Sequence, residues 1–356
     1  MSELAGIPAV AVYAVTSQGA DLAAKVAAGF ASTGGAALFL PRRLEERFGA
    51  GFNYFDSFGQ AAQDNFKLFS GHIMIGATGL IVRLIAPLLV SKKEDPAVVV
   101  LTQDGRFAIS LLSGHLGGAN ALAGKTADIC GGQAVIGTAT DIEGLPALEM
   151  VARDLDLFID DFARLPLISR LLVEGEQLKV YDPAGFLTEA LRPWADHFEF
   201  VGAAPASGPQ VRVDFKLEDD LPPEALVMRP KSVALAMGCH RGIDRAEVDE
   251  FIDQTLAKEK ISLKAVALLA TVESRAEEPA FLAISQDRGW PLVIFSKADL
   301  GRVNVPNPSG KVMERIGVSS VCEAAAMLAA KTDRLLILKQ KSARATLAAA
   351  LINQKP

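Results

Sequence analysis

Residues 113–120 combine a histidine, a serine and three glycines within eight positions, reading Ser-Gly-His-Leu-Gly-Gly-Ala-Asn. His115 titrates in the range that a general base needs near neutral pH. The glycines allow the backbone to approach a ligand closely, and the N–H groups that open a helix at Ala119 could hold an oxyanion or a carboxylate. Hydrolysis of an ester carbonyl needs both kinds of group. The predicted binding residues of this segment are Gly114, Gly117, Gly118 and Asn120.

Ser113 is a second catalytic candidate, as a nucleophile, although the sequence around it lacks the pattern of a nucleophile elbow. The alternative is structural: in a turn from strand to helix, Ser113 would cap the helix and His115 would make a structural hydrogen bond. Glycine-rich turns of this kind are common without any catalytic role. The residues alone leave both interpretations open.

Thr140 and Asp141 close a further segment, residues 138–141, which reads Thr-Ala-Thr-Asp and follows a predicted strand at 134–137. We expect this strand end to share the sheet edge of His115, because the carboxyl ends of parallel strands meet at one edge. Asp141 would then orient His115 or act as the base itself, and Thr140 would contact the ligand. An N-cap for the following helix is the ordinary alternative for these side chains.

Residues 76–83 read Gly-Ala-Thr-Gly-Leu-Ile-Val-Arg and repeat this design, an apolar strand (73–76), a small-residue loop and a helix (80–89). Free N–H groups at such a helix start favour an anionic ligand. Thr78 is predicted to cap the helix and Arg83 to bind a carboxylate. A capping role alone for Thr78 and a surface ion pair for Arg83 are the alternatives. The predicted binding residues here are Gly76, Thr78, Gly79 and Arg83.

The last third of the chain contains a comparable strand-end loop, residues 238–242, which reads Gly-Cys-His-Arg-Gly. Arg241 is predicted to bind substrate carboxylates, and His240 is placed with it among the binding residues as a secondary acid–base candidate. The adjacent pair Cys239 and His240 lacks the spacing of metal ligands, so no metal site is predicted.

The composition is that of a folded, acidic protein, with 356 residues, 50% hydrophobic, 22% charged and a net charge of −6. This charge argues against nucleic-acid binding. No apolar run reaches the roughly 18 residues that span a bilayer, and the N-terminus lacks the pattern of a signal peptide. Three cysteines without metal-type spacing favour a reducing compartment. We therefore expect a cytoplasmic protein without membrane partners.

Strand and helix patterns alternate at both ends of the chain and weaken between them. Such alternation predicts parallel sheets covered by helices. We expect two three-layer α/β units with mainly parallel sheets, residues 1–145 and 231–356, joined by a smaller mixed middle segment, residues 146–230. Ser17 is predicted to cap the first helix, and residues 96–101 and 107–112 to form a hairpin near the sheet edge. Short helices are expected at 186–194 and 311–316.

The segments 76–83, 113–120 and 138–141, in this order and spacing, resemble the cobalt-precorrin-5A hydrolase family of the anaerobic cobalamin pathway. The chain after Ser232 resembles the C-terminal domain of that family and a small stand-alone protein of the aerobic pathway, whereas residues 145–230 are less similar. The resemblance implies a hydrolase that opens a δ-lactone on a cobalt corrinoid substrate and releases acetaldehyde. It also implies that the cobalt belongs to the substrate, that no cofactor is needed, and that other cobalamin-pathway enzymes are candidate partners.

Family members share a lysine and an acidic pair in one C-terminal loop, and here that place holds Ser-Arg-Ala-Glu-Glu-Pro at 274–279. Arg275 keeps the charge of lysine but not its titration range, so a role for a deprotonated lysine is in conflict with this sequence. Two other functions are compatible with the residues: a non-catalytic carrier of corrinoid intermediates, and an unrelated enzyme with a phosphate ligand. The absence of the common nucleotide-binding glycine motifs counts against the second.

Overall fold

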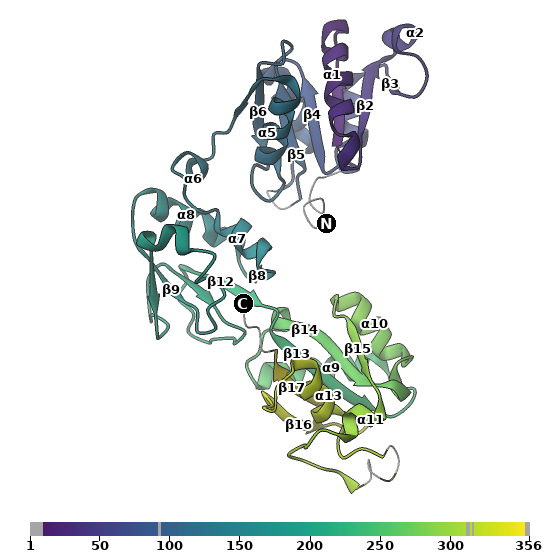
Figure 1. Cartoon of the computed structure of the whole chain (residues 1–356), viewed down its shortest axis with the longest axis vertical. Helices are drawn as coiled ribbons and strands as arrows, with labels where there is room; N and C mark the ends of the chain where they lie inside the picture. Colours follow the sequence, from purple (N-terminus) through teal and green to yellow (C-terminus); the bar gives the residue numbers. More distant parts are fainter. Residues whose placement is uncertain (1–9, 92–93, 311–313, 315–316, 353–356) are drawn as a thin grey trace. The chain divides into compact units, whose positions relative to one another are not determined.

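The computed structural model describes residues 10–91, 94–310, 314 and 317–352. The chain folds into two compact units, residues 1–150 and 151–356. The described strands form three separate sheets, one of seven strands in the first unit and two of five strands in the second (Figure 1). The predicted mixed α/β fold is confirmed, while the separate middle domain at 146–230 stays a prediction. No helix in the described part of the chain is both long and apolar enough to cross a membrane.

The sheet of the first unit is parallel except at one pair of strands. Its strands lie in the order β3-β2-β1-β4-β5-β6-β7, and β5 and β6 are the antiparallel pair, as the hairpin prediction requires. The strands are β1 (Val10–Ala14), β2 (Ala36–Pro41), β3 (Asn53–Phe55), β4 (Gly71–Ile75), β5 (Ala97–Leu101), β6 (Phe107–Leu112) and β7 (Gln133–Val135).

Helices cover both faces of this sheet. Successive residues of a strand point to opposite faces, and all five residues of β1 are apolar and buried, as a strand between two helical layers requires. Val10 and Val12 face α1 (Ser17–Gly29) and α5 (Ala119–Cys130), which lie together in front of the sheet in Figure 1. Tyr13 faces α3 (Phe58–Asn65) and α4 (Thr78–Ile85). A short α2 (Glu45–Phe48) precedes β3.

Two helix starts differ from the predictions. Thr16, and not Ser17, caps α1, because its backbone is extended and its hydroxyl accepts a hydrogen bond from the Gly19 N–H at 3.0 Å. Thr78 is the first residue of α4, and the cap position belongs to Ala77, which makes no side-chain bond there. In both helices the cap is the extended residue directly before the first turn.

Because β6 runs in the reverse direction, two of the predicted motifs, residues 76–83 and 113–120, lie at opposite ends of the strands. The Gly76 N–H donates to the Leu101 carbonyl at 3.1 Å, at the end of β5, whereas the Ser113 hydroxyl donates to the Asp95 carbonyl at 2.9 Å, before β5 begins. Six residues of extended chain span about 20 Å. The two glycine motifs therefore lie at opposite ends of the strands, because β6 runs against β4 and β5.

The second unit contains a mixed sheet in the order β10-β9-β11-β12-β8, antiparallel at β12 and β8 only. The predicted helix at 186–194 is wrong: turns are followed by the 3-10 helix η5 (Arg192–His197). The Asp182 carboxylate accepts hydrogen bonds from the N–H groups of Gly185 and Leu187, which stabilises turns instead. The elements are β8 (Leu157–Ile159), α8 (Leu165–Val173), β9 (Leu178–Tyr181), β10 (Phe198–Val201), β11 (Gln210–Val213) and β12 (Ala225–Pro230).

The last sheet lies in the order β15-β14-β13-β17-β16, with helices on both faces. The strand β17 is antiparallel to both of its neighbours and was not predicted, because its alanine-rich run has Thr346 as its single β-branched residue. The helix expected at 311–316 lies outside the described residues apart from Glu314. The strands are β13 (Val233–Cys239), β14 (Val266–Val272), β15 (Leu292–Phe295), β16 (Ile337–Lys341) and β17 (Ala345–Leu351); the helices are α9 (Arg245–Lys258), α10 (Pro279–Arg288), α11 (Lys297–Gly301) and α13 (Val321–Ala330).

Candidate active site

The loop between β6 and α5 is tightly closed on itself. Ser113 has a left-handed backbone, with φ of 57°, and its hydroxyl donates to the Asp95 carbonyl. A Cβ on Gly117 would lie 2.4 Å from the Ser113 Cβ, so the turn accepts only glycine there. Ser113 thus fastens the loop to the chain before β5. It does not cap α5, whose N-cap is Gly118, and its role as a nucleophile stays a prediction.

The N–H groups at the start of α5 bond within this loop. The Gly118 N–H donates to the His115 carbonyl at 2.9 Å, and the N–H groups of Ala119 and Asn120 donate to the carbonyls of Ser113 and Gly114 at 3.0 Å. Gly118, with φ of 85°, makes the turn that brings these groups together. The loop's own carbonyls therefore occupy three of the donors expected to hold an oxyanion, and the oxyanion cradle at this helix start stays a prediction.

His115 lies between two carboxylates. Its Nε2 is 2.9 Å from Asp141 Oδ2, and its Nδ1 is 2.8 Å from Glu149 Oε1. Asp141 belongs to α6 (Ala139–Ile142), which follows β7, and Glu149 to α7 (Leu148–Asp154). The side chains of His115 and Glu149 are 15% and 16% exposed, whereas that of Asp141 is 40% exposed. The imidazole and the inner carboxylate are shielded from water, and Asp141 is the member that a ligand can reach.

Asn120 fixes Asp141 from the other side. Its Nδ2 donates to Asp141 Oδ2 at 2.9 Å, while its Oδ1 accepts a hydrogen bond from the Ser110 hydroxyl at 2.6 Å. An ionised carboxylate only accepts hydrogen bonds, so Asp141 determines which way the amide points, and the amide oxygen faces the Ser110 hydroxyl. A Cβ on Gly114 would lie 2.7 Å from Asn120 Oδ1, which explains the glycine beside it. Asn120 acts here as a support for Asp141, and its predicted role in binding substrate stays a prediction.

The surroundings of His115 favour its charged form. The hydrogen bond to Glu149 is the largest cause that raises the pKa of His115 above its ordinary value, and the bond to Asp141 raises it further. Burial opposes them by disfavouring the charge. An imidazole with a raised pKa keeps its proton to a higher pH than an ordinary histidine does.

Two further residues near His115 are Thr140, which was predicted as a site residue, and Glu149, which was not. Thr140 is buried, and its hydroxyl has no hydrogen-bond partner among the described residues, so its predicted contact with a ligand stays a prediction. Glu149 was not predicted as a site residue. It lies just beyond the domain boundary expected near residue 145, and no motif marks it in the sequence.

The second glycine motif lies at the other edge of the sheet. Gly76, Thr78 and Gly79 stand at the end of β4 and the start of α4, about 20 Å along the strands from the Ser113 loop. Arg83 lies in the last turn of α4, on the path that returns the chain to the edge where β5 begins. It is exposed and has no ion-pair partner in the described chain, so the surface ion pair is absent. Its binding role stays a prediction.

The predicted residues His240 and Arg241 follow β13 in the second unit, and both are exposed. Their loop is held from behind: Arg275 Nε donates to the Cys239 carbonyl at 2.8 Å, and the Gly242 N–H donates to the buried Glu278 carboxylate at 3.0 Å. Arg275 therefore supports the loop through its shape and charge. Burial raises the pKa of the Cys239 thiol to about 11, which agrees with an unreactive cysteine.

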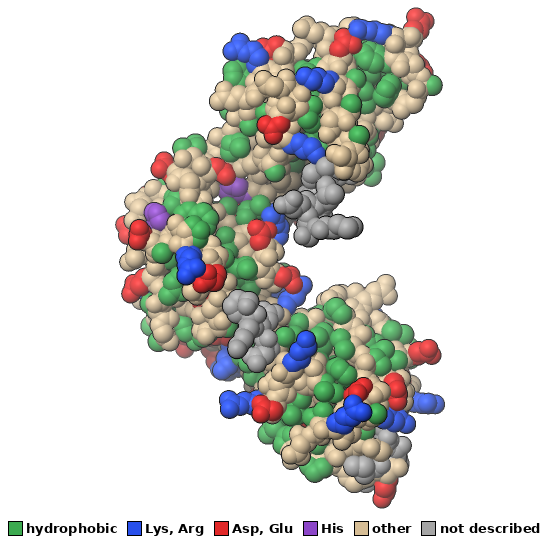
Figure 2. All heavy atoms as spheres, viewed as in Figure 1, with side chains coloured by type: hydrophobic (Ala, Val, Ile, Leu, Met, Phe, Trp, Pro, Cys, Tyr) green, Lys and Arg blue, Asp and Glu red, His purple; other side chains and the backbone are tan. Residues whose placement is uncertain are grey.

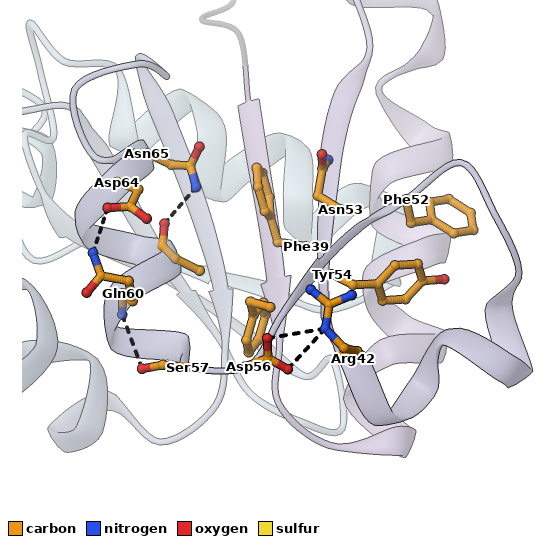
Figure 3. A pocket seen from close by; sticks show the side chains of 12 residues that line it. Phe39, Arg42, Phe52, Asn53, Tyr54, Asp56, Ser57, Gln60, Asp64 and Asn65 are labelled. Carbon is orange, nitrogen blue, oxygen red and sulfur yellow. Dashed lines mark hydrogen bonds and ion pairs between the residues drawn. The ribbon is translucent and has the colours of Figure 1, made fainter.

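A separate pocket of about 670 Å³ lies between β3 and α3 in the first unit (Figure 3). Phe39 and Phe52 supply aromatic surface, and Arg42 is paired with Asp56 at 3.1 Å on its rim. None of the predicted site residues lines it. On the face seen in Figure 2, basic and acidic side chains are interspersed, without an extended basic stripe.

The chain is thus an α/β protein with a carboxylate–histidine–carboxylate cluster, a set of groups that can exchange protons. Three family models match the chain: the cobalamin synthesis G N-terminal model at residues 60–141, the cobalamin biosynthesis central region at 146–230, and the cobalamin synthesis G C-terminus at 233–350. His115 and Asp141 fall within the first match and Glu149 within the second.

Relatives of known name agree with these models. A cobalt-precorrin-5A hydrolase of Priestia megaterium is 32% identical over 298 residues, 81% of this chain and 80% of that protein. A cobalt-precorrin-5A hydrolase of Salmonella typhimurium is 30% identical over 331 residues, 90% of this chain and 91% of that protein. Protein CobE of Sinorhizobium sp is 33% identical over 121 residues, 33% of this chain and 79% of that protein. The chain belongs to the cobalamin synthesis G family, as its motifs predict.

Proposed function

We propose that this chain is a hydrolase that opens the δ-lactone of cobalt-precorrin-5A and releases acetaldehyde. Relatives at 32% and 30% identity, matched over 80% and 91% of their lengths, bear the name of this activity. The observation that carries the proposal is His115 between Asp141 and Glu149 at the end of β6. Ester hydrolysis needs one group that accepts a proton from water and one that protonates the leaving oxygen, and this cluster contains both.

The proposed reaction balances through proton transfers alone. A water oxygen bonds to the lactone carbonyl carbon as its proton passes to the His115–Asp141 pair, and the leaving ring oxygen takes a proton when its bond to that carbon breaks. The new hydroxyl then loses its proton and becomes the aldehyde oxygen as the adjoining carbon–carbon bond breaks. The electron pair of that bond stays on the macrocycle, which takes up a proton. The cobalt enters as part of the substrate, and no added cofactor is proposed.

Substrate carboxylates are proposed to bind at Arg83 and Arg241. Both guanidinium groups are exposed and lack an ion-pair partner in the described chain, so each can offer its full set of donors. Arg245, in contrast, is paired with Asp249 at 3.2 Å and with Asp287 at 2.6 Å. We also propose a cytoplasmic location, which the three free cysteines support.

Release of acetaldehyde separates this proposal from a non-catalytic carrier of corrinoid intermediates. The purified chain should release one acetaldehyde per cobalt-precorrin-5A, and His115→Ala should lower turnover by about 10²–10⁴-fold, because it breaks the His115–Asp141 pair that handles the proton of the water. His197→Gln, which changes a histidine of η5 outside the site, is the matched control. Tight binding of the corrinoid without any acetaldehyde would establish the carrier instead.

A further inference from the structure

The hydrogen bonds around His115 assign separate roles to its two carboxylates. We propose that Glu149 is a positioning residue that keeps His115 doubly protonated, so that Asp141, and not His115, takes the proton of the attacking water. The division of roles rests on the proposed function, but the protonation of His115 can be measured without it.

The first step concerns the number of protons on the ring. Ionised carboxylates only accept hydrogen bonds, and a neutral imidazole carries one N–H. His115 faces a carboxylate at each nitrogen, at 2.8 Å and 2.9 Å, so a neutral ring would set one bare nitrogen against a carboxylate. The imidazolium satisfies both partners. Asp141 and Glu149 are the titratable groups that act on His115, one from α6 and one from α7.

The second step concerns which carboxylate holds the proton on the ring. Glu149 is the more buried of the two, and its bond is the largest contribution that raises the pKa of His115. A charge-assisted hydrogen bond away from water is stronger than one at the surface. Glu149 thus fixes both the orientation and the charge of the ring from its sheltered side.

The third step concerns the atom that is available to water. Asp141 Oδ2 accepts hydrogen bonds from His115 and Asn120, each at 2.9 Å, whereas Oδ1 has no hydrogen bond within the described chain. In the proposed step the water O–H bond breaks, the oxygen bonds to the lactone carbon, and the proton moves to Oδ1. The same proton is then available to the leaving oxygen. His115 keeps its two protons and holds the carboxylate in place.

Glu149→Gln tests the assignment, because the amide oxygen can still accept from Nδ1 while the charge is lost. Activity should require a protonated His115, so the decline in kcat at alkaline pH should move to lower pH in the variant. On the alkaline side of the profile we expect a kcat about tenfold or more below that of the unchanged protein, and on the acid side we expect the two values to lie within about threefold of each other. Glu143→Gln removes a carboxylate from the same segment outside the site and should leave the profile unchanged.

The direction of the shift decides between the roles. If neutral His115 is the base, Glu149→Gln should raise activity on the acid side of the profile, which would overturn the proposal. A uniform loss at every pH would show a merely structural role for Glu149 and would also overturn it. Histidine NMR of the unchanged protein gives a test without substrate: the chain has four histidines, and His115→Gln identifies one signal. A His115 that titrates at or below the ordinary value of about 6.5 would refute the charged form even if acetaldehyde is released.

Discussion

Asp141→Asn is the most direct test of the proton acceptor, because the structure predicts an almost unchanged geometry. The asparagine carbonyl can take the place of Oδ2 and accept from His115 and Asn120, while its amide group takes the place of the unpaired Oδ1. Only the basic oxygen is lost. Since the replaced side chain is 40% exposed, the free energy of unfolding should change by about 1 kcal/mol or less.

The catalytic loss should be far larger than the loss of stability. Removal of a general base lowers kcat by roughly 10²–10⁴-fold, which is about 3–5 kcal/mol of activation free energy. Acetaldehyde release, followed by NADH consumption with an added alcohol dehydrogenase, gives kcat and KM, and thermal unfolding checks the fold. We expect KM to stay within about threefold if Asp141 acts only in the chemical step. A variant that retains more than about a tenth of the original kcat would show that Asp141 only orients His115.

The same variant carries a second expectation for His115. Since the hydrogen bond to Glu149 is the larger cause of its raised pKa, Asp141→Asn should lower the pKa of His115 less than Glu149→Gln does. Histidine NMR of both variants measures the order directly. The reverse order would mean that the exposed carboxylate, and not the sheltered one, holds the proton on the ring.

Three further outcomes follow from the described residues. Arg83→Ala should weaken corrinoid binding by roughly 1–3 kcal/mol, with Arg106→Ala as an exposed control, and an unchanged titration would remove Arg83 from the site. Gly117→Ala should lower the free energy of unfolding by roughly 1–3 kcal/mol, because the added Cβ would lie 2.4 Å from the Cβ of Ser113. The control is Gly124→Ala in α5, where the added Cβ meets nothing within 4 Å, so this change should be neutral or stabilising. Equal urea midpoints for the two variants would contradict the predicted clash at Gly117. Burial lowers the pKa of His72 to about 4, so the unfolded state binds the extra proton between about 6.5 and 4, and stability should fall by up to about 3 kcal/mol as pH falls through that window. The free energy of unfolding, measured with urea, should depend less on pH for His72→Phe than for the unchanged protein. Equal pH dependence in the two proteins would refute the role of His72.

Local signals in the sequence predicted those elements whose ends are marked by their own residues. The bounds of α5 follow from glycines at both ends, and β6 has the predicted limits, residues 107–112. The short distance between His115 and Asp141 also follows local rules, since β6 and β7 are parallel neighbours. The opposite placement of Gly76 and Ser113 follows from the antiparallel pairing of β6 with β5, which the hairpin prediction gives, together with the parallel pairing of β4 with β5.

The remaining site features arise from tertiary contacts that have no sequence signature. Glu149 reaches His115 from 34 residues away, and nothing around it distinguishes it from other surface acids. The internal bonding of the α5 start depends on the backbone of Ser113 and Gly118, which composition does not reveal. In the sequence, Arg275 stands where family members have a lysine. In the structure, its Nε donates a hydrogen bond to the Cys239 carbonyl, so Arg275 supports the loop.

The position of β17 has a consequence for synthesis on the ribosome. This strand is the last described element of the chain, yet it lies between β13 and β16 and pairs with β13 along seven residues. Proteins are made from the N-terminus, and pairing between distant strands is slow because a long loop must close first. The last sheet therefore stays divided, with β16 detached from β13, until β17 has left the ribosome. Without β17, the strands β13 and β16 would each have an open edge, and such edges promote aggregation.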